Sequence, residues 1–146
     1  MTFKLTYSTM FDPPEEMHAR FEAALAELRA ELGATRAMHI DGADEAGRPV
    51  AEHRSPVDRR LVLGLSPRGE AADVERAVAA AKWAFPAWRA TPVAERLALV
   101  RRAAALIEER VYRIGAALAL EAGKNRMEGL AEAQETADFF SGYAAG

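Results

Sequence analysis

Three carboxylates near the end of the chain are spaced so that they could form a ligand site. Glu128, Glu132 and Glu135 follow one another at steps of four and three residues, so a helix would place them on one face. One of them could face a ligand cation, because a carboxylate that pairs with an ammonium group in a closed pocket makes a strong, directional contact. A solvated acidic face is the plainer explanation, and spacing alone does not select one of the three.

A Gly-Lys pair at Gly123 and Lys124 invites comparison with a phosphate-binding loop. That loop has a glycine five residues earlier and a Ser or Thr after the lysine, whereas this chain has neither, and Asn125 follows Lys124. A helix C-cap at Gly123, with the positive charge of Lys124 near the helix C-terminus, explains the pair better. The sequence also lacks a GxGxxG motif, so we predict no cofactor-binding residue.

The composition excludes several classes of function. The 146 residues carry a formal charge of -3 with both signs interspersed, which argues against a nucleic-acid-binding surface. No stretch reaches the ~20 apolar residues of a membrane span, and the N-terminus lacks a signal peptide, so we predict a cytoplasmic protein. Without cysteine, no disulfide or thiol chemistry is possible. The three histidines stand far apart in the sequence, so we predict no metal site.

The elements that must position these residues begin with a helix predicted from Pro13 to Leu32. Asp12 is a suitable N-cap, the two prolines suit the first turn, and apolar residues recur at helical spacing. Gly33 is placed to end the helix. Three short strands are then predicted at 38–40, 49–53 and 60–65, with turn residues such as Asp41-Gly42 between them. Such a ribbon is marginally stable alone and needs a partner surface.

The rest of the chain is predicted to be helical. One helix runs from about Glu70 to Ala84 and stops at Pro86; Thr91 caps the next, which breaks near Arg110. The apolar seam of this second segment could also form a coiled coil, but it is short and mixes Ala with Leu. A last helix follows from about 125 to 146. The aromatic residues around the proline are predicted to form a packed elbow between two helices: Trp83, Phe85 and Trp88.

The order of several segments resembles the amino-terminal part of the aldehyde dehydrogenase fold, over about residues 36–146. These segments are Arg54-Ser55-Pro56-Val57-Asp58, 73–81, Ala84-Phe85-Pro86-Ala87-Trp88, Thr91-Pro92-Val93-Ala94-Glu95-Arg96 and 103–107. The stretch 121–125, with Glu135-x-x-Asp138-Phe139 and Tyr143-Ala144 behind it, is similar to the L-glutamate γ-semialdehyde (1-pyrroline-5-carboxylate) branch of that family. The chain departs from the family at Ser55-Pro56, where Asn-Pro is common.

The resemblance implies a fold that is mainly α with a small β-ribbon (α+β), without the complete Rossmann-type and catalytic domains. It divides the chain into an N-terminal extension (1–35), a β-ribbon (36–68) and an incomplete helical segment (69–146). Enzymes of this branch oxidise L-glutamate γ-semialdehyde to L-glutamate with NAD, in proline degradation. Their helix glutamate, which approaches the substrate's α-amino group, aligns with Glu135. The resemblance therefore favours Glu135 over the other two carboxylates.

The missing cysteine conflicts with the activity that the resemblance implies. The family uses a cysteine nucleophile, a glutamate base and an asparagine oxyanion donor, all beyond the matched region, so we predict no catalytic residue here. We therefore expect an amino-terminal portion of such an enzyme that is inactive alone and binds no NAD alone. Its expected partners are the remainder of the dehydrogenase, or further copies of itself through exposed apolar helix faces, and the complete enzyme would bind a small-molecule substrate. The alternative is a stand-alone helical interaction module derived from the family.

Overall fold

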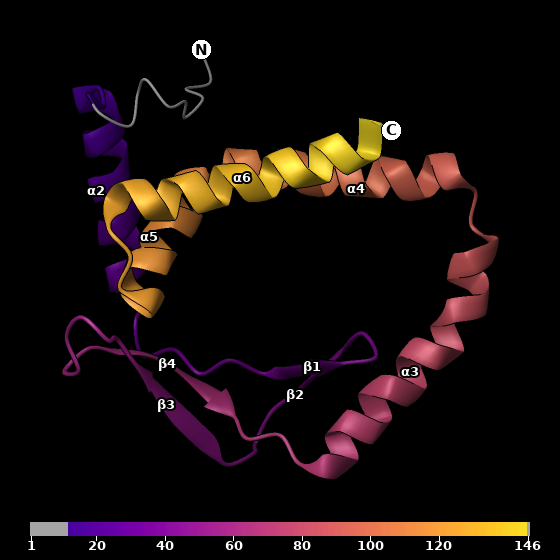
Figure 1. The fold of residues 1–146 in the computed structure, drawn as a ribbon. Helices are drawn as coiled ribbons and strands as arrows, with labels where there is room; N and C mark the ends of the chain where they lie inside the picture. Colours follow the sequence, from indigo (N-terminus) through magenta and orange to yellow (C-terminus); the bar gives the residue numbers. More distant parts are fainter. Residues whose placement is uncertain (1–11, 146) are drawn as a thin grey trace.

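The computed structural model describes residues 12–145 as an open frame of helices and short strands (Figure 1). A group of helices lies along one side, two small sheets lie opposite, and one long helix joins them. The elements in chain order are α2 (Glu15–Ala30), β1 (Met38–Ile40), β2 (Ala43–Glu45), β3 (Val50–Arg54), β4 (Val62–Pro67), α3 (Ala71–Ala90), α4 (Val93–Glu109), α5 (Val111–Ala122) and α6 (Arg126–Ala145). The predicted fold class, mainly α with a small β-ribbon (α+β), is confirmed.

Each of the two sheets is a pair of antiparallel strands. Strand β1 pairs with β2 through a tight turn at Asp41-Gly42, where both residues have positive φ, 54° and 75°. This is the Asp-Gly hairpin chemistry expected from the sequence, although the strand β2 itself was not predicted. Strand β3 pairs with β4, with an irregularity between His53 and Arg54. On its other edge β4 receives Thr35 in a parallel bridge, so the chain that leaves α2 is tied to the ribbon.

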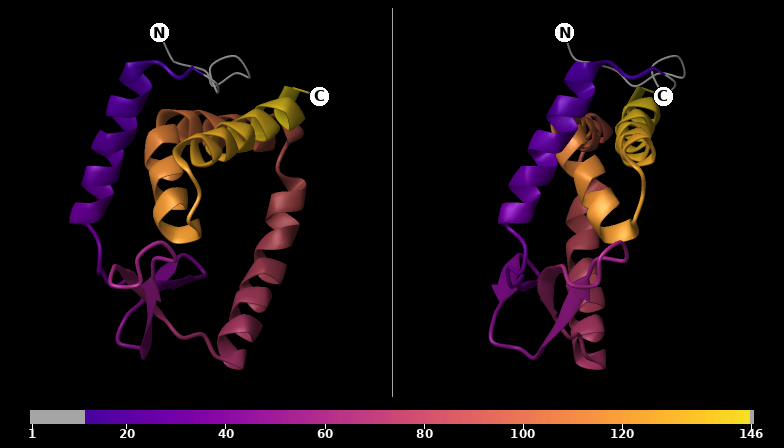
Figure 2. Two further views of the ribbon diagram at one scale, coloured as in Figure 1. Left: turned by 60° about the vertical axis from the view of Figure 1, so that its left-hand side comes forward. Right: turned by 90° about the vertical axis from the view of Figure 1, so that its left-hand side faces the viewer.

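Helix α2 is held against α5 and α6 by the main hydrophobic core. From α2, Met17, Phe21 and Ala24 are buried against Tyr112 and Leu130, among others. Figure 2 shows α2 standing beside α5, and α6 lying along α4. Burial of this apolar stripe is the dominant force that holds the amino-terminal helix in place.

The predicted ends of α2 need correction. The N-cap position belongs to Pro14, which makes no side-chain cap hydrogen bond, so the prediction that Asp12 caps the helix is wrong. A residue before a proline avoids the helical region, and Pro14 is itself extended (φ -66°, ψ 148°), so the helix begins only at Glu15. At the other end the helix stops at Ala30, and Gly33 (φ 79°) instead donates its N–H to the carbonyl of Leu63.

Helices α5 and α6 cross at a pair of glycines. A Cβ on Gly129 would lie 2.6 Å from the carbonyl oxygen of Gly115, and one on Gly115 would lie 2.9 Å from a methyl of Leu130. Neither position has room for a side chain. Beyond the crossing, α6 lies along α4 through small buried residues, including Ala104 and Ala137. Small side chains thus allow the three helices to approach closely.

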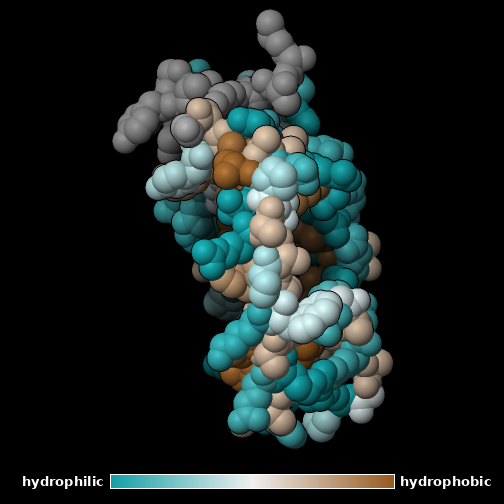
Figure 3. Space-filling view, turned by 90° about the vertical axis from the view of Figure 1, so that its right-hand side faces the viewer, coloured by the Kyte–Doolittle hydropathy of each residue, from teal (hydrophilic) through white to brown (hydrophobic). Residues whose placement is uncertain are grey.

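Helix α3 is the most exposed of the helices, because all its residues are exposed except buried Asp73 and half-buried Ala80. It continues through Pro86 to Ala90, so the prediction that it stops at the proline is wrong. A proline removes one helical hydrogen bond but does not forbid the helix when the chain on both sides stays helical. The predicted aromatic elbow is also wrong: Trp83 is 81% exposed, Phe85 57% and Trp88 45%. The side of the molecule that α3 forms mixes hydrophilic and moderately hydrophobic residues (Figure 3).

The prediction that Thr91 caps the following helix is wrong as well. The N-cap of α4 is Pro92, without a side-chain hydrogen bond. Thr91 instead ends α3, where its hydroxyl donates to the carbonyl of Ala87 at 3.0 Å. A threonine between two helices can serve either neighbour, and here it satisfies one of the carbonyls that the end of α3 leaves without a partner.

Candidate functional site

The junction between α5 and α6 fixes where α6 begins. Gly123 adopts the left-handed conformation (φ 72°, ψ 21°) and ends α5, as the sequence predicted. Asn125 and Glu128 then cap α6 reciprocally. The Asn125 side-chain oxygen accepts from the backbone N–H of Glu128 at 3.0 Å, and the Glu128 carboxylate accepts from the N–H of Asn125 at 3.1 Å. This pair has the geometry of a capping box and sets the first turn of the helix.

The structure separates the three carboxylates that spacing left equivalent. Glu128 is used in the cap, and Glu132 forms an ion pair with Lys124. Glu135 is exposed and has no hydrogen bond or ion pair with any residue in the described range 12–145. Of the three, Glu135 is therefore the carboxylate left available for a ligand. Its role in binding remains a prediction.

An aromatic pair continues the face on which Glu135 lies. Phe139 and Tyr143 follow at steps of four residues, and their rings stack with centroids 6.3 Å apart and planes 20° apart. Phe139 is 55% exposed and Tyr143 81%. A carboxylate followed by two exposed rings can bind an ammonium group and apolar carbon atoms.

One long-range contact holds the last turn of α6 in position, and a second ties the ribbon to α5. The guanidinium of Arg101 in α4 donates to the carbonyl of Ala144 at 2.6 Å, near the last turn of α6. At the other end, buried Ser55 ties the ribbon to α5, because its hydroxyl donates to the carbonyl of Leu120 at 2.7 Å. The sequence indicates that position 55 is unusual, because the family that the chain resembles commonly has Asn where this chain has Ser55.

A cation–π and ion-pair cluster that the sequence did not suggest joins α6 to α2. Arg126, the first residue of α6, lies 4.8 Å from the ring centroid of Phe21 and donates to Nδ1 of His18 at 2.6 Å, and it also pairs with Glu22. Because a guanidinium can only donate, the Nδ1 of His18 must be the acceptor. These contacts pin the amino-terminal helix to the start of α6.

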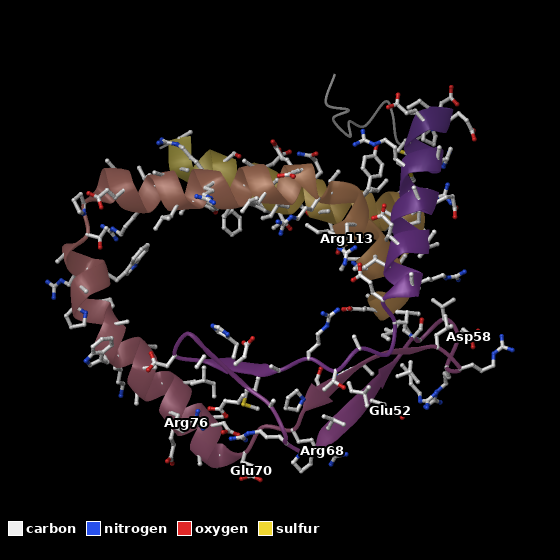
Figure 4. The ribbon with its side chains drawn as sticks, turned by 180° about the vertical axis from the view of Figure 1, so that it is seen from behind. Glu52, Asp58, Arg68, Glu70, Arg76 and Arg113 are labelled. Atoms are coloured by element: carbon white, nitrogen blue, oxygen red, sulfur yellow. The ribbon has the colours of Figure 1, made fainter. Side chains whose placement is uncertain are left out.

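A second charged cluster lies at the foot of α3, where Figure 4 shows Glu70 and Arg76 beside the ribbon. The carboxylate of Asp73 is buried; it accepts from the backbone N–H of Glu70 at 2.8 Å and from Arg48 at 2.6 Å. The N–H of Glu70, then Arg48, hold the pKa of Asp73 below its ordinary value. All partners are supplied by the protein, so this cluster is structural: it joins α3 to the hairpin.

Two further features, a metal-binding cluster and a membrane-spanning helix, are not found among the described residues. Residues 12–145 contain no group of three or more His, Cys, Asp or Glu side chains placed to hold a metal ion. His18, His39 and His53 lie in α2, β1 and β3. Within the same range, no helix has both the length and the hydropathy needed to cross a membrane.

Comparison with known proteins gives a consistent set of relatives. The sequence pattern of the aldehyde dehydrogenase family matches residues 43–146. A 1-pyrroline-5-carboxylate dehydrogenase of Bacillus pumilus is 34% identical over 130 residues, which cover 89% of this chain and 25% of that protein. An N-succinylglutamate 5-semialdehyde dehydrogenase of Burkholderia lata is 44% identical over 97 residues, covering 65% of this chain and 20% of that protein.

The structure is also similar to solved dehydrogenases. The crystal structure of 1-pyrroline-5-carboxylate dehydrogenase from Thermus with bound NAD superposes with a TM-score of 0.86 at 30% identity. The match covers 92% of this chain and 26% of that one. The chain therefore spans about a quarter of the length of the relatives it matches.

Proposed function

Because the chain belongs to the aldehyde dehydrogenase family, we propose that it is the amino-terminal portion of an NAD-dependent enzyme that oxidises L-glutamate γ-semialdehyde to L-glutamate. We further propose that this portion is not catalytic on its own. The observation that carries the proposal is the match of nearly the whole chain to 1-pyrroline-5-carboxylate dehydrogenases in both sequence and structure. The absence of cysteine supports the second part, because the resembling enzymes form a covalent intermediate with a thiolate.

Glu135 is proposed to bind the α-ammonium group of the substrate. Its two neighbours on the same face already have protein partners, whereas Glu135 is exposed and unpaired within residues 12–145. The stacked rings of Phe139 and Tyr143 would then lie beside the carbon chain of the ligand. An ammonium–carboxylate contact becomes strong only when water is excluded, so the rest of the enzyme has to close over this face.

NAD is proposed to bind outside this portion of the enzyme. Within residues 12–145 the strands form only two-stranded antiparallel sheets, apart from the single parallel bridge at Thr35. A dinucleotide fold needs a parallel sheet with a glycine-rich turn, and the sequence has no such turn. Similar complete enzymes bind NAD, and their cofactor site would have to come from the other three quarters of the protein.

The partner that this portion needs is proposed to cover α3. A 20-residue helix that buries only one residue, Asp73, gains little from packing within this chain. Its exposed side chains include Val74, Trp83 and Phe85, which are the kinds of residue that pack against a neighbour. We propose the remainder of the dehydrogenase as this neighbour; self-association of the free chain is the alternative that a sizing experiment would reveal.

One observation makes N-succinylglutamate 5-semialdehyde a second candidate substrate: the 44% identity to a dehydrogenase named for that compound. In that compound the amino nitrogen is acylated, so it carries no positive charge and adds a carboxylate instead. An unpaired Glu135 carboxylate would repel such a ligand, whereas it would attract the free ammonium group of glutamate semialdehyde. The carboxylate at position 135 therefore favours the free amino acid semialdehyde.

The test is complementation. The chain is mixed with the Bacillus pumilus relative from which the matching quarter has been removed, and NADH formation from glutamate semialdehyde is measured. We expect activity from the mixture and none from either piece. If both pieces are folded and no activity returns, the proposed function fails, and a stand-alone interaction module becomes the better interpretation.

Glu135→Gln tests the substrate contact in the same assay. Loss of a charged hydrogen bond, worth roughly 1.5–3 kcal/mol, should lower kcat/KM for glutamate semialdehyde about 10- to 100-fold. Activity with propanal, which has no amino group, should stay within twofold. Glu109→Gln, at the exposed end of α4, is the matched control. Equal losses of activity with glutamate semialdehyde and with propanal would contradict the ammonium contact. A higher kcat/KM of the wild type for the N-succinyl compound than for glutamate semialdehyde would favour the N-succinyl compound as the substrate.

A further inference from the structure

A cavity separate from the face of Glu135 lies between the β3–β4 ribbon and the end of α5. Its volume is about 370 Å³, and its walls carry both cationic and anionic side chains. Arg36 comes from the segment that follows α2, His53 from β3, Ser66 from β4 and Glu121 from the last turn of α5. A cavity of this size accommodates a small molecule but not a dinucleotide.

Arg36 brings to this cavity a positive charge that has no ion-pair partner among residues 12–145. Within the described chain, no carboxylate lies within 4.0 Å of its guanidinium. Arg36 does lower the pKa of Glu31, but Arg113 does so more strongly, since it pairs with Glu31 at 2.6 Å. The other arginine of the cavity, Arg54, is occupied: it pairs with a glutamate of its own strand at 2.5 Å and donates to a backbone carbonyl at 3.0 Å.

Glu121 brings a negative charge to the same cavity. Its carboxylate is exposed and has no hydrogen bond or ion pair with residues 12–145. It stands in the last turn of α5, where the free carbonyl groups and the helix dipole add negative potential. One of these carbonyls, that of Leu120, is already occupied by the Ser55 hydroxyl. The remaining potential attracts a cation.

We propose that this cavity binds a free α-amino acid as a zwitterion. The ligand's carboxylate lies on Arg36, whose planar fork suits a carboxylate, and near the hydroxyl of Ser66. Its ammonium group lies on Glu121 at the C-terminal end of α5. Arg36 and Glu121 line the same cavity without forming an ion pair with each other, so a ligand that carries both charges can pair with both residues. A simple anion would meet the repulsion of Glu121, and a simple cation that of Arg36.

This site is independent of the proposed substrate contact, and a three-ligand titration tests it. The chain is titrated with L-leucine, with 4-methylpentanoate, which lacks the ammonium group, and with 3-methylbutylamine, which lacks the carboxylate. Binding is followed through the backbone amide NMR signals of His53 and Gly64, which line the cavity. We expect saturable shifts with leucine and an affinity at least about tenfold higher than that of either analogue, since each analogue loses one charged contact.

Variants assign the two ends of the ligand. Arg36→Gln and Glu121→Gln should each weaken leucine binding about tenfold or more and remove the preference over the corresponding analogue. Arg68→Gln and Glu75→Gln, which change exposed charges outside the cavity, should leave it unchanged. The proposal is overturned if leucine produces no saturable shift, if leucine and 4-methylpentanoate bind equally, or if Glu121→Gln has no effect. None of these outcomes bears on Glu135, so this site and the proposed function can fail separately.

Discussion

Replacing Gly129 by alanine should destabilise the helical part of the molecule, because α5 and α6 touch there through their backbones. The new Cβ would lie 2.6 Å from the carbonyl oxygen of Gly115, whereas ordinary contacts begin at 3.4 Å. Neither helix backbone can rotate away, so the helices must separate by most of an ångström. Overpacking of this kind costs about 1–3 kcal/mol and sometimes more. Because the new Cβ meets backbone atoms, the upper end of that range applies, and alanine recovers about 1 kcal/mol of helix propensity, so we expect a net loss of roughly 2 kcal/mol.

Gly142, on the same helix, provides the matched control. A Cβ there would meet nothing within 4 Å, so Gly142→Ala should gain about 0.5–1 kcal/mol from the lower backbone entropy of the unfolded chain. Urea unfolding monitored by circular dichroism would measure both changes. For a chain of this length, each kcal/mol of unfolding free energy shifts Tm by roughly 3 °C. Gly129→Ala should therefore lower Tm by about 6 °C, while Gly142→Ala should raise it slightly.

If Gly129→Ala is as stable as the wild type, or gains as much as Gly142→Ala, the helices do not cross at the distance observed here. A change in the slope of the unfolding free energy against urea, without a change of midpoint, would indicate an effect on the compactness of the unfolded or folded state instead.

Three further changes probe the contacts around the ribbon and α3. Ser55→Ala leaves the carbonyl of Leu120 without its partner, so it should lower the free energy of unfolding by about 1–3 kcal/mol in the same urea assay. The pKa of Asp73 is depressed below 3.8, so its stabilising contribution is present above that pH and is lost as pH falls through the lower folded-state value. Asp73→Asn should therefore flatten the acid side of a plot of urea midpoint against pH, and an unchanged slope would contradict the assignment. Trp83→Ser, at an 81% exposed position, should change stability by less than about 0.5 kcal/mol yet weaken complementation with the rest of the enzyme.

The sequence predicted the helices and most of the strands because local signals determine them. Gly123 ends α5 in a left-handed conformation, and Asp41-Gly42 forms the hairpin turn, since few other residue types tolerate positive φ. The same local reasoning failed at Pro86 and Thr91. Proline weakens a helix by one hydrogen bond, but whether the helix stops depends on the residues beyond it, and threonine can satisfy the helix on either side.

The contacts that place α6 could not be predicted from local signals. The Gly115–Gly129 crossing, the bond from Arg101 to Ala144, and the contact of Arg126 with α2 all join residues far apart in the chain. Spacing placed the three glutamates on one face, but only tertiary structure shows which of them have protein partners. The family resemblance and the structure favour Glu135 for independent reasons, the first from a motif and the second from the absence of a partner within residues 12–145.

If Glu135 binds substrate as proposed, these contacts determine how much of that site can form before the rest of the proposed enzyme is present. The backbone at Glu135 is fixed by the Asn125 cap, by the glycine crossing and by Arg101, all of which lie within this chain. None of them involves α3, whose few tertiary contacts suggest that it opens at low free energy. The position of the carboxylate should therefore be set before the rest of the enzyme docks, whereas the exclusion of water, which gives an ammonium–carboxylate contact its strength, depends on docking. Under the proposed function, we therefore expect the free chain to bind glutamate semialdehyde weakly, and to bind it strongly only after complementation.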